Sequence, residues 1–316
     1  TPLYSSAASD VYKRQGLFLL TNMVSCAQLN AGKRGDSLTE MSIRIATGKL
    51  DIIFIQEPWN LKKSNLKGGR FMYSNKIFDK PHRAAIWVSE IFDKTGKCIV
   101  LENLSDRDCV TMKAEINIDG KPKTVLLSSI YMPTYEEIIT SNANGNTTTK
   151  NKYINNPVTN LMEEIGNYAK ANNLDLVISC DSNSHSDLWG ENFEDNRGSK
   201  LIDYALNHNL VIMNVGDIPT FVEGNKKSFI DLTIVSQNFM TYILEWRVDD
   251  INNSFSDHRY IYFKINSKNF VCESKFSKRK TDWKKYKKRV QERIRNLFVQ
   301  AKTKNDLDLL ASDFNL

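Results

Sequence analysis

The chain of 316 residues carries 43 Lys and Arg against 37 Asp and Glu, a formal net charge of +6. Hydrophobic residues make up 41% and charged residues 25%. This composition is typical of a soluble globular protein and excludes a disordered or collagen-like chain. The longest apolar run, at residues 16–20, is far shorter than the roughly 20 residues that a membrane span needs, so we expect no contact with a membrane.

The five cysteines indicate reduced thiols. They are odd in number and widely spaced, and no two of them form a CxxC pair. A disulfide framework or a zinc site usually needs paired, closely spaced cysteines. We therefore expect free thiols in a reducing compartment.

In chain order, residues 1–22 show no period of helix or strand, and we predict a non-native or disordered leader there. Residues 23–270 alternate between strand and helix patterns, which predicts one domain. Ser37 and Glu40 have the spacing of a capping box at the start of the first helix. Predicted strands lie at 24–29, 51–55, 84–88, 110–118, 125–131, 174–179, 210–213, 230–235 and 260–265, and predicted helices at 38–45, 161–169 and 201–206.

The polar segment 134–157 contains an Asn-rich run and three threonines, and we predict a long mobile loop there. Strands outnumber helices, and several strands follow one another directly. This favours an α+β fold over a doubly wound parallel sheet. We expect two packed, mostly antiparallel sheets with helices outside them.

The basic charge is concentrated in the last part of the chain. Residues 273–316 hold 13 Lys and Arg against 6 Asp and Glu. We predict a basic helical linker over residues 271–316, because apolar residues recur there near helical spacing. Its charge fits either a solvated helix face or attraction to nucleic-acid phosphates, and charge alone does not decide between them.

Polar residues stand at the ends of several predicted strands, where a fold can deliver them to one point. Carboxylate oxygens suit Mg²⁺ rather than zinc, and a histidine is the natural general base near neutral pH. These residues also have plain alternatives. Glu57-Pro58 and the segment from Asp181 to Asn183 fit turns, because Asp and Asn hydrogen-bond their own backbone, and Asp257-His258 fits a surface dipeptide. The candidates are Asn30, Glu57, Asp181, Asn183, Asp231, Asp257 and His258.

Nine short motifs occur together and in order. In this order and combination, the sequence resembles the endonuclease/exonuclease/phosphatase family, and more narrowly the apurinic-like endonuclease domain of non-LTR retrotransposon (LINE-type) proteins. The motifs are Ala27-Gln28-Leu29-Asn30, Ile55-Gln56-Glu57-Pro58-Trp59, Ile130-Tyr131-Met132-Pro133, Cys180-Asp181-Ser182-Asn183-Ser184-His185, Leu188-Trp189-Gly190, Asn196-Arg197-Gly198, Pro219-Thr220-Phe221, Ile230-Asp231-Leu232-Thr233 and Ser256-Asp257-His258.

The resemblance implies a four-layer α/β sandwich and a Mg²⁺ cofactor, for which Mn²⁺ can substitute. Glu57 matches the direct metal ligand of the family. Asn30 matches a second metal-site position, and Asp257 matches a residue at or near the metal.

The resemblance also implies a set of catalytic residues. His258 matches the catalytic histidine, and Asp231 matches the carboxylate that orients it. Asp181 and Asn183 match the pair that handles the nucleophilic water and the scissile phosphate, and Tyr131 matches a tyrosine near that phosphate. Whether Asp181 or His258 takes the proton of the water stays open at this point.

The activity implied by the resemblance is a Mg²⁺-dependent endonuclease that nicks double-stranded target DNA. The nick leaves a 3′-hydroxyl, which primes reverse transcription of the element's RNA. Under this reading the basic linker precedes a reverse transcriptase domain and contacts the RNA, and the protein works in the nucleus. Two alternatives stay open: an abasic-site nuclease or other phosphoesterase of the same fold, and a catalytically silent remnant that binds nucleic acid. The sequence does not give the oligomeric state.

Overall fold

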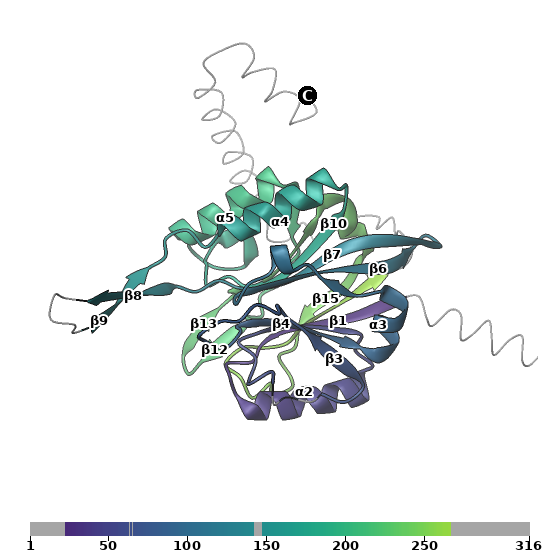
Figure 1. Ribbon diagram of the computed structural model, residues 1–316, viewed down its shortest axis with the longest axis horizontal. Helices are drawn as coiled ribbons and strands as arrows, with labels where there is room; N and C mark the ends of the chain where they lie inside the picture. Colours follow the sequence, from purple (N-terminus) through teal and green to yellow (C-terminus); the bar gives the residue numbers. More distant parts are fainter. Residues whose placement is uncertain (1–22, 63, 65, 142–146, 267–316) are drawn as a thin grey trace, which may run out of the picture. The chain divides into compact units, whose positions relative to one another are not determined.

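The computed structural model describes residues 23–62, 64, 66–141 and 147–266, which form two six-stranded sheets packed face to face (Figure 1). The predictions for residues 1–22 and 271–316 lie outside this range. The first sheet has the order β15 (Ile243–Val248), β16 (Ile261–Asn266), β1 (Met23–Asn30), β2 (Ile52–Gln56), β4 (Ala84–Ser89) and β3 (Gly69–Met72). The second has the order β11 (Leu210–Ile212), β14 (Asp231–Ser236), β10 (Asp175–Asp181), β7 (Lys121–Tyr131), β6 (Cys109–Ile118) and β5 (Ile99–Val100).

The helices lie on the outer faces of the sheets. Figure 1 shows α4 (Asn160–Ala171) and α5 (Asn196–Asn207) over the second sheet and α2 (Gly35–Gly48) over the first. The other helical segments are α3 (Glu90–Gly96), η1 (Glu102–Leu104), η2 (Asp187–Trp189) and η3 (Gln237–Tyr242). Among the described residues, none of the helices combines the length and the apolar character that crossing a bilayer requires.

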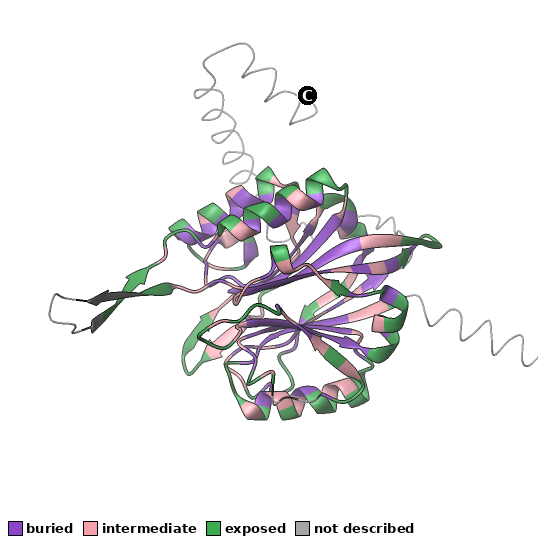
Figure 2. Cartoon of the chain, in the orientation of Figure 1, coloured by how far each residue is buried: buried purple, intermediate pink, exposed green. Residues whose placement is uncertain are grey.

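Each sheet pairs its strands mostly antiparallel. The exceptions are β1 with β2 in the first sheet and β7 with β10 in the second, which run parallel. The prediction of two packed, mostly antiparallel sheets flanked by helices is thus confirmed, as a four-layer α/β sandwich. The continuously apolar runs explain the central strands, because β2 and β10 are buried along their whole length and on both faces (Figure 2).

The main core lies between the two sheets, and two smaller cores lie under the outer helices. The central one joins Phe54 and Ile86 of the first sheet to Leu127 and Val177 of the second. The four cysteines within the described residues are free and buried in these cores.

A polar seam crosses the otherwise apolar core where the strands end. It consists of the side-chain amides of Gln28, Asn30 and Gln56 on the first sheet and their acceptors on the second. Gln28 Nε2 donates to the carbonyl of Cys180 at 3.0 Å. Gln56 Nε2 donates to Ser129 Oγ at 2.9 Å and to the carbonyl of Ser179 at 3.0 Å. Because a buried donor without a partner is costly, these bonds specify how the two sheets lie against each other.

The prediction of a loop over residues 134–157 is wrong. Strands β8 (Tyr135–Ser141) and β9 (Thr147–Tyr153) pair antiparallel into a hairpin that projects from the body (Figure 1). The rings of Tyr135 and Tyr153 meet edge to face at 5.5 Å, and Lys152 forms an ion pair with Glu136 at 3.0 Å. Polar residues make up most of both strands, so the alternating apolar pattern that marks a strand is absent, and these described cross-strand contacts stabilise the base of the hairpin. A second hairpin joins β12 (Phe221–Glu223) and β13 (Lys226–Ser228).

The predicted capping box is also wrong. Helix α2 begins at Gly35, and its N-cap, Arg34, makes no side-chain capping bond. Ser37 therefore lies inside the first turn, where its side chain is fully buried. The chain leaves β1, turns through Gly32 and Lys33 in left-handed conformations, and enters the helix before it reaches Ser37.

Replacing Gln56 tests the polar seam. Gln56→Met keeps the volume but leaves the carbonyl of Ser179 and the hydroxyl of Ser129 without this donor. We expect a loss of about 1–3 kcal/mol in the free energy of unfolding, measured by urea denaturation. The matched control Gln237→Met, at an exposed position, should change stability by less than about 0.5 kcal/mol. Equal effects of the two substitutions would show that the seam does not contribute to stability.

Candidate active site

Three of the predicted site residues lie in one row across the second sheet. Asp181 is the last residue of β10, and it pairs with Tyr131 at the end of parallel β7. It also pairs with Asp231 at the start of antiparallel β14. The strand register thus brings three residues from distant parts of the sequence to the same edge.

The first sheet supplies two more predicted residues at the facing edge. Strands β1 and β2 run parallel with Asn30 opposite Gln56, so Asn30 and Glu57 emerge together. Asn30 Nδ2 donates to Asp181 Oδ2 at 2.7 Å, which joins the two sheets at the site. Glu57 has a φ of 44° and Asn183 a φ of 45°. Asparagine tolerates this left-handed conformation, whereas for a glutamate it is uncommon and strained.

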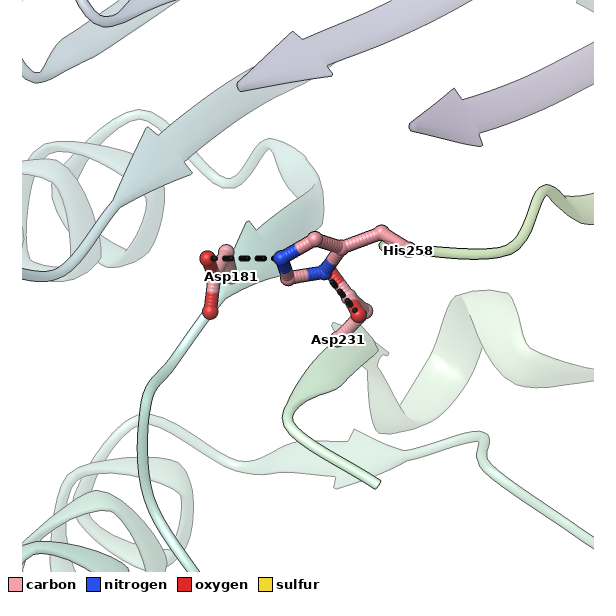
Figure 3. A group of neighbouring side chains, drawn as sticks. All are labelled: Asp181, Asp231 and His258. Carbon is pink, nitrogen blue, oxygen red and sulfur yellow. Dashed lines mark hydrogen bonds and ion pairs between the residues drawn. The ribbon is translucent and has the colours of Figure 1, made fainter. Parts of the chain in front are cut away.

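His258 completes a buried cluster with the two aspartates (Figure 3). Its Nδ1 lies 2.8 Å from Asp231 Oδ2, and its Nε2 lies 3.9 Å from Asp181 Oδ2. Because an ionised carboxylate only accepts, Nδ1 donates to Asp231 and Nε2 points toward Asp181. The Phe221 ring packs edge-on against the imidazole at 5.0 Å. The cluster therefore holds the histidine ring in one orientation.

The charges of this cluster shift its pKa values. Burial by itself lowers the pKa of His258, but the charge and hydrogen bond of Asp231, together with the charges of Asp181 and Glu57, raise it to about 9. The pKa of Asp181 is raised, chiefly by burial and partly by the charge of Asp231, against the opposing effect of the imidazolium. Burial and then the charges of Glu57 and Asp181 raise the pKa of the Tyr131 phenol. At neutral pH His258 is therefore a cation and Tyr131 a neutral donor.

These groups line an open cavity of about 340 Å³ at the ends of both sheets. Six predicted site residues contribute to its wall: Asn30, Glu57, Tyr131, Asp181, Asn183 and His258. Asp231 is buried and lies on the Nδ1 side of His258, where it contacts the histidine and does not line the cavity.

Asp257 is not brought into the cavity. Its carboxylate is partly exposed and forms an ion pair with Arg34 at 2.8 Å. Asp257 precedes His258 directly, but the two side chains have different partners. A role of Asp257 in metal binding would require its carboxylate to leave Arg34.

The oxygen-rich edge of the cavity fits a hard divalent cation. The Glu57 carboxylate lies at this edge and already binds a cation, the ammonium of Lys33, at 2.6 Å. Asn30 lines the same cavity with an amide oxygen that accepts from the backbone N–H of Gly32. Carboxylate and amide oxygens are suitable ligands for Mg²⁺.

A second set of potential ligand atoms belongs to Asp181, Asp231 and His258, within 4.8 Å of one another. The histidine is a poor ligand there. A protonated imidazole offers no lone pair, and the pKa of His258 is raised to about 9. The donor chemistry therefore favours Glu57 and Asn30 as the metal-binding pair.

Sequence reasoning missed several residues of the cavity wall. Thr134 and Tyr153 enter it from the base of the β8–β9 hairpin, and Phe221 enters it from β12. His185 and Asp195 line it from the chain between β10 and α5. His185 belongs to one of the sequence motifs and could have been included. Tyr153 belongs to no motif, and its position in the cavity wall depends on the β8–β9 hairpin, which was not predicted.

The sequence and the fold were compared with known proteins. Residues 125–262 match the family described as endonuclease-reverse transcriptase. No curated protein matches the chain. The matched segment runs from β7 to β16 and includes Asp181, Asp231 and His258.

Solved structures that share the fold include the following three. The endonuclease domain of TRAS1, a telomere-specific non-LTR retrotransposon, has a TM-score of 0.60 and 25% sequence identity, covering 77% of this chain and 98% of that chain. The AP endonuclease LMAP from Leishmania major has a TM-score of 0.56 and 12% identity, covering 78% and 88%. The Xenopus laevis APE2 catalytic domain has a TM-score of 0.54 and 11% identity, covering 79% and 95%. The chain therefore has the fold of a hydrolytic nuclease, matches the endonuclease-reverse transcriptase family over residues 125–262, and is similar to the endonuclease domain of a non-LTR retrotransposon protein.

Proposed function

We propose that the chain is a Mg²⁺-dependent endonuclease that nicks double-stranded DNA and leaves a 3′-hydroxyl for target-primed reverse transcription. The observation that carries this proposal is the convergence of Glu57, Asp181, Asn183 and a protonated His258 on one open cavity. The likeness to the TRAS1 endonuclease domain supports DNA as the substrate. We further propose that the basic linker contacts the element's RNA and that the protein acts in the nucleus.

The protein's own groups account for the main needs of phosphodiester hydrolysis. Asp181 faces the cavity with a raised pKa and accepts a proton from the attacking water. His258, kept protonated by Asp231, donates from Nε2 to the phosphoryl oxygens where negative charge develops. Asn183, whose side-chain amide donates to the carbonyl of Met132 at 3.1 Å, is held at the cavity wall beside the phosphate.

The bond changes balance as follows. The water oxygen forms a bond to phosphorus, and the bond from phosphorus to O3′ breaks. The departing O3′ needs a proton, and the Tyr131 phenol is a neutral donor near the site. Mg²⁺, or Mn²⁺ in its place, would be held by Glu57 and Asn30, where it polarises the phosphoryl oxygen and shields its charge. The products are a 3′-hydroxyl and a 5′-phosphate.

Nicking of supercoiled plasmid tests this function. We expect relaxed circles with Mg²⁺ or Mn²⁺ and intact plasmid with EDTA. Glu57→Gln and His258→Ala should each slow nicking by about 10²–10⁴-fold, because they remove a metal ligand and a proton donor. Glu90→Gln, at an exposed position on α3, is the matched control and should nick like the wild type. A folded wild-type chain that leaves the plasmid intact with both metals contradicts the proposal.

The ends left at the nick distinguish this function from that of an abasic-site nuclease or another phosphoesterase. We expect that DNA ligase reseals the nicked plasmid and that a DNA polymerase extends it, because both enzymes require the 3′-hydroxyl. A duplex without damage should be cut as readily as one with a single abasic site. Cleavage confined to the abasic duplex would instead identify a repair nuclease, and a 3′-phosphate product would exclude priming.

Asp231→Asn tests how the histidine is kept protonated. Removing the carboxylate charge takes away the largest effect that raises the pKa of His258, so this pKa should fall from about 9, although the charges of Asp181 and Glu57 remain. NMR titration of the metal-free protein labelled at its histidines measures this directly, with His258→Gln to assign the signal. Nicking should slow in parallel. An unchanged titration of His258 would mean that Asp231 does not set its charge.

A further inference from the structure

A buried arginine lies directly behind the wall of the cavity. Arg197 is in the first turn of α5, and its side chain is fully buried. All five guanidinium N–H donors bind backbone carbonyls, which satisfies the group completely. The acceptors are the carbonyls of Asn183 (2.8 Å), Pro133 (3.1 Å), Ile154 (2.7 Å), Met132 (3.1 Å) and Ser182 (2.9 Å).

This arrangement is unusual for a buried charge. Buried charged groups are normally paired with an opposite charge. None of the five hydrogen bonds of Arg197 goes to a carboxylate. Five carbonyl dipoles bind the cation directly, and Asp195 and Asp181 act on it only through their charges. A side chain needed only for packing would not require a guanidinium here, because an apolar residue would avoid the desolvation cost.

The five carbonyls belong to three segments that form the cavity wall. Residues 132–133 lead from β7 into the β8–β9 hairpin, and Ile154 follows that hairpin. Residues 182–183 belong to the loop after β10. Thr134, Tyr153 and Asn183, at or next to these carbonyls, all line the cavity. One side chain therefore fixes the base of the projecting hairpin against the loop that carries Asn183.

The residues beside Arg197 in the sequence hold the start of α5 against the loop that contains Asn183. The Asp195 carboxylate caps α5 by accepting from the backbone N–H of Gly198 at 2.6 Å, and it also accepts from the N–H of His185 at 3.2 Å. A Cβ at Gly198 would lie 2.0 Å from the carbonyl oxygen of His185, so only glycine allows the helix to approach this closely. The Asn-Arg-Gly motif thus docks the start of α5 onto the loop.

We propose that Arg197 is a positioning residue that holds the Asn183 loop and the base of the β8–β9 hairpin in the geometry needed for phosphodiester cleavage. The inference rests on the proposed function. Because all five hydrogen bonds of Arg197 go to backbone carbonyls behind the wall, we expect its loss to act on turnover and to leave the affinity for DNA unchanged.

Arg197→Lys in the 316-residue chain tests this role. Lysine offers three donors, so at least two carbonyls lose their partner. We expect kcat for plasmid nicking to fall by about 100-fold, the cost of misplacing a reacting group by about 1 Å, while the Kd for a short duplex in EDTA stays the same. Amide hydrogen exchange should rise at residues 132, 134, 154 and 182–185.

The control is Tyr204→Phe, which removes another buried hydrogen bond of α5, from the Tyr204 hydroxyl to the carbonyl of Met162. It should lower stability without changing kcat or exchange in the three segments. If Arg197→Lys does not fold, Gly198→Ala carries the same test, because it pushes the helix away from the loop.

Two results would overturn the inference: an unchanged kcat in a folded variant, or an equal loss of kcat and DNA affinity. If the wild-type chain cleaves no DNA, the proposed function fails. Hydrogen exchange then still decides whether Arg197 holds the three segments together.

Discussion

The hydrogen bond from Asn30 to Asp181 joins the two sheets at the point where the chemistry is proposed to occur. It is the last bond of the polar seam, whose other donors are the amides of Gln28 and Gln56. Apolar contacts alone would let the sheets slide with little change in buried area, whereas buried amides have partners at one alignment only. That alignment brings Glu57 of one sheet and Asp181 of the other into one cavity.

This alignment of the sheets also stabilises buried charges and a strained backbone that would be unfavourable elsewhere in the protein. Asp181 and Asp231 lie side by side and buried, and the imidazolium of His258, which lies between them, offsets part of their negative charge. Glu57 and Asn183 adopt left-handed backbones at the cavity wall. The rigid sheets hold such strain in place. Arg197 fixes the loops at the cavity in a similar way. It donates hydrogen bonds to backbone carbonyls that no neighbouring strand pairs with.

The parts of the fold that depend on local apolar patterns could be predicted from the sequence. The continuous run in residues 52–55 and the alternation in residues 110–118 mark strands that the structure contains. The β8–β9 hairpin could not be predicted this way, because its strands are mostly polar and show no alternating apolar pattern. The short strands β3, β5 and β12 and the irregular β15 were missed for a related reason, since few of their residues are fully buried.

The candidate site was predictable as a set of residues but not as a geometry. Motif order identified Asn30, Glu57 and Asp181, which the structure brings together. The motifs do not show that Asp257 turns toward Arg34, because that depends on a side chain 223 residues away. The hydrogen bonds of Arg197 could not be predicted either, because they go to backbone carbonyls, which every residue has.

The central claim is that a metal at Glu57 and a protonated His258 act on the same phosphate. Crystals of the chain with Mn²⁺ and a short nicked DNA duplex would test it through the anomalous scattering of manganese. The account predicts a peak beside the Glu57 carboxylate, with a phosphate between it and His258 Nε2. A manganese ion bound to Asp181, Asp231 and His258, with the imidazole as a ligand, would contradict it.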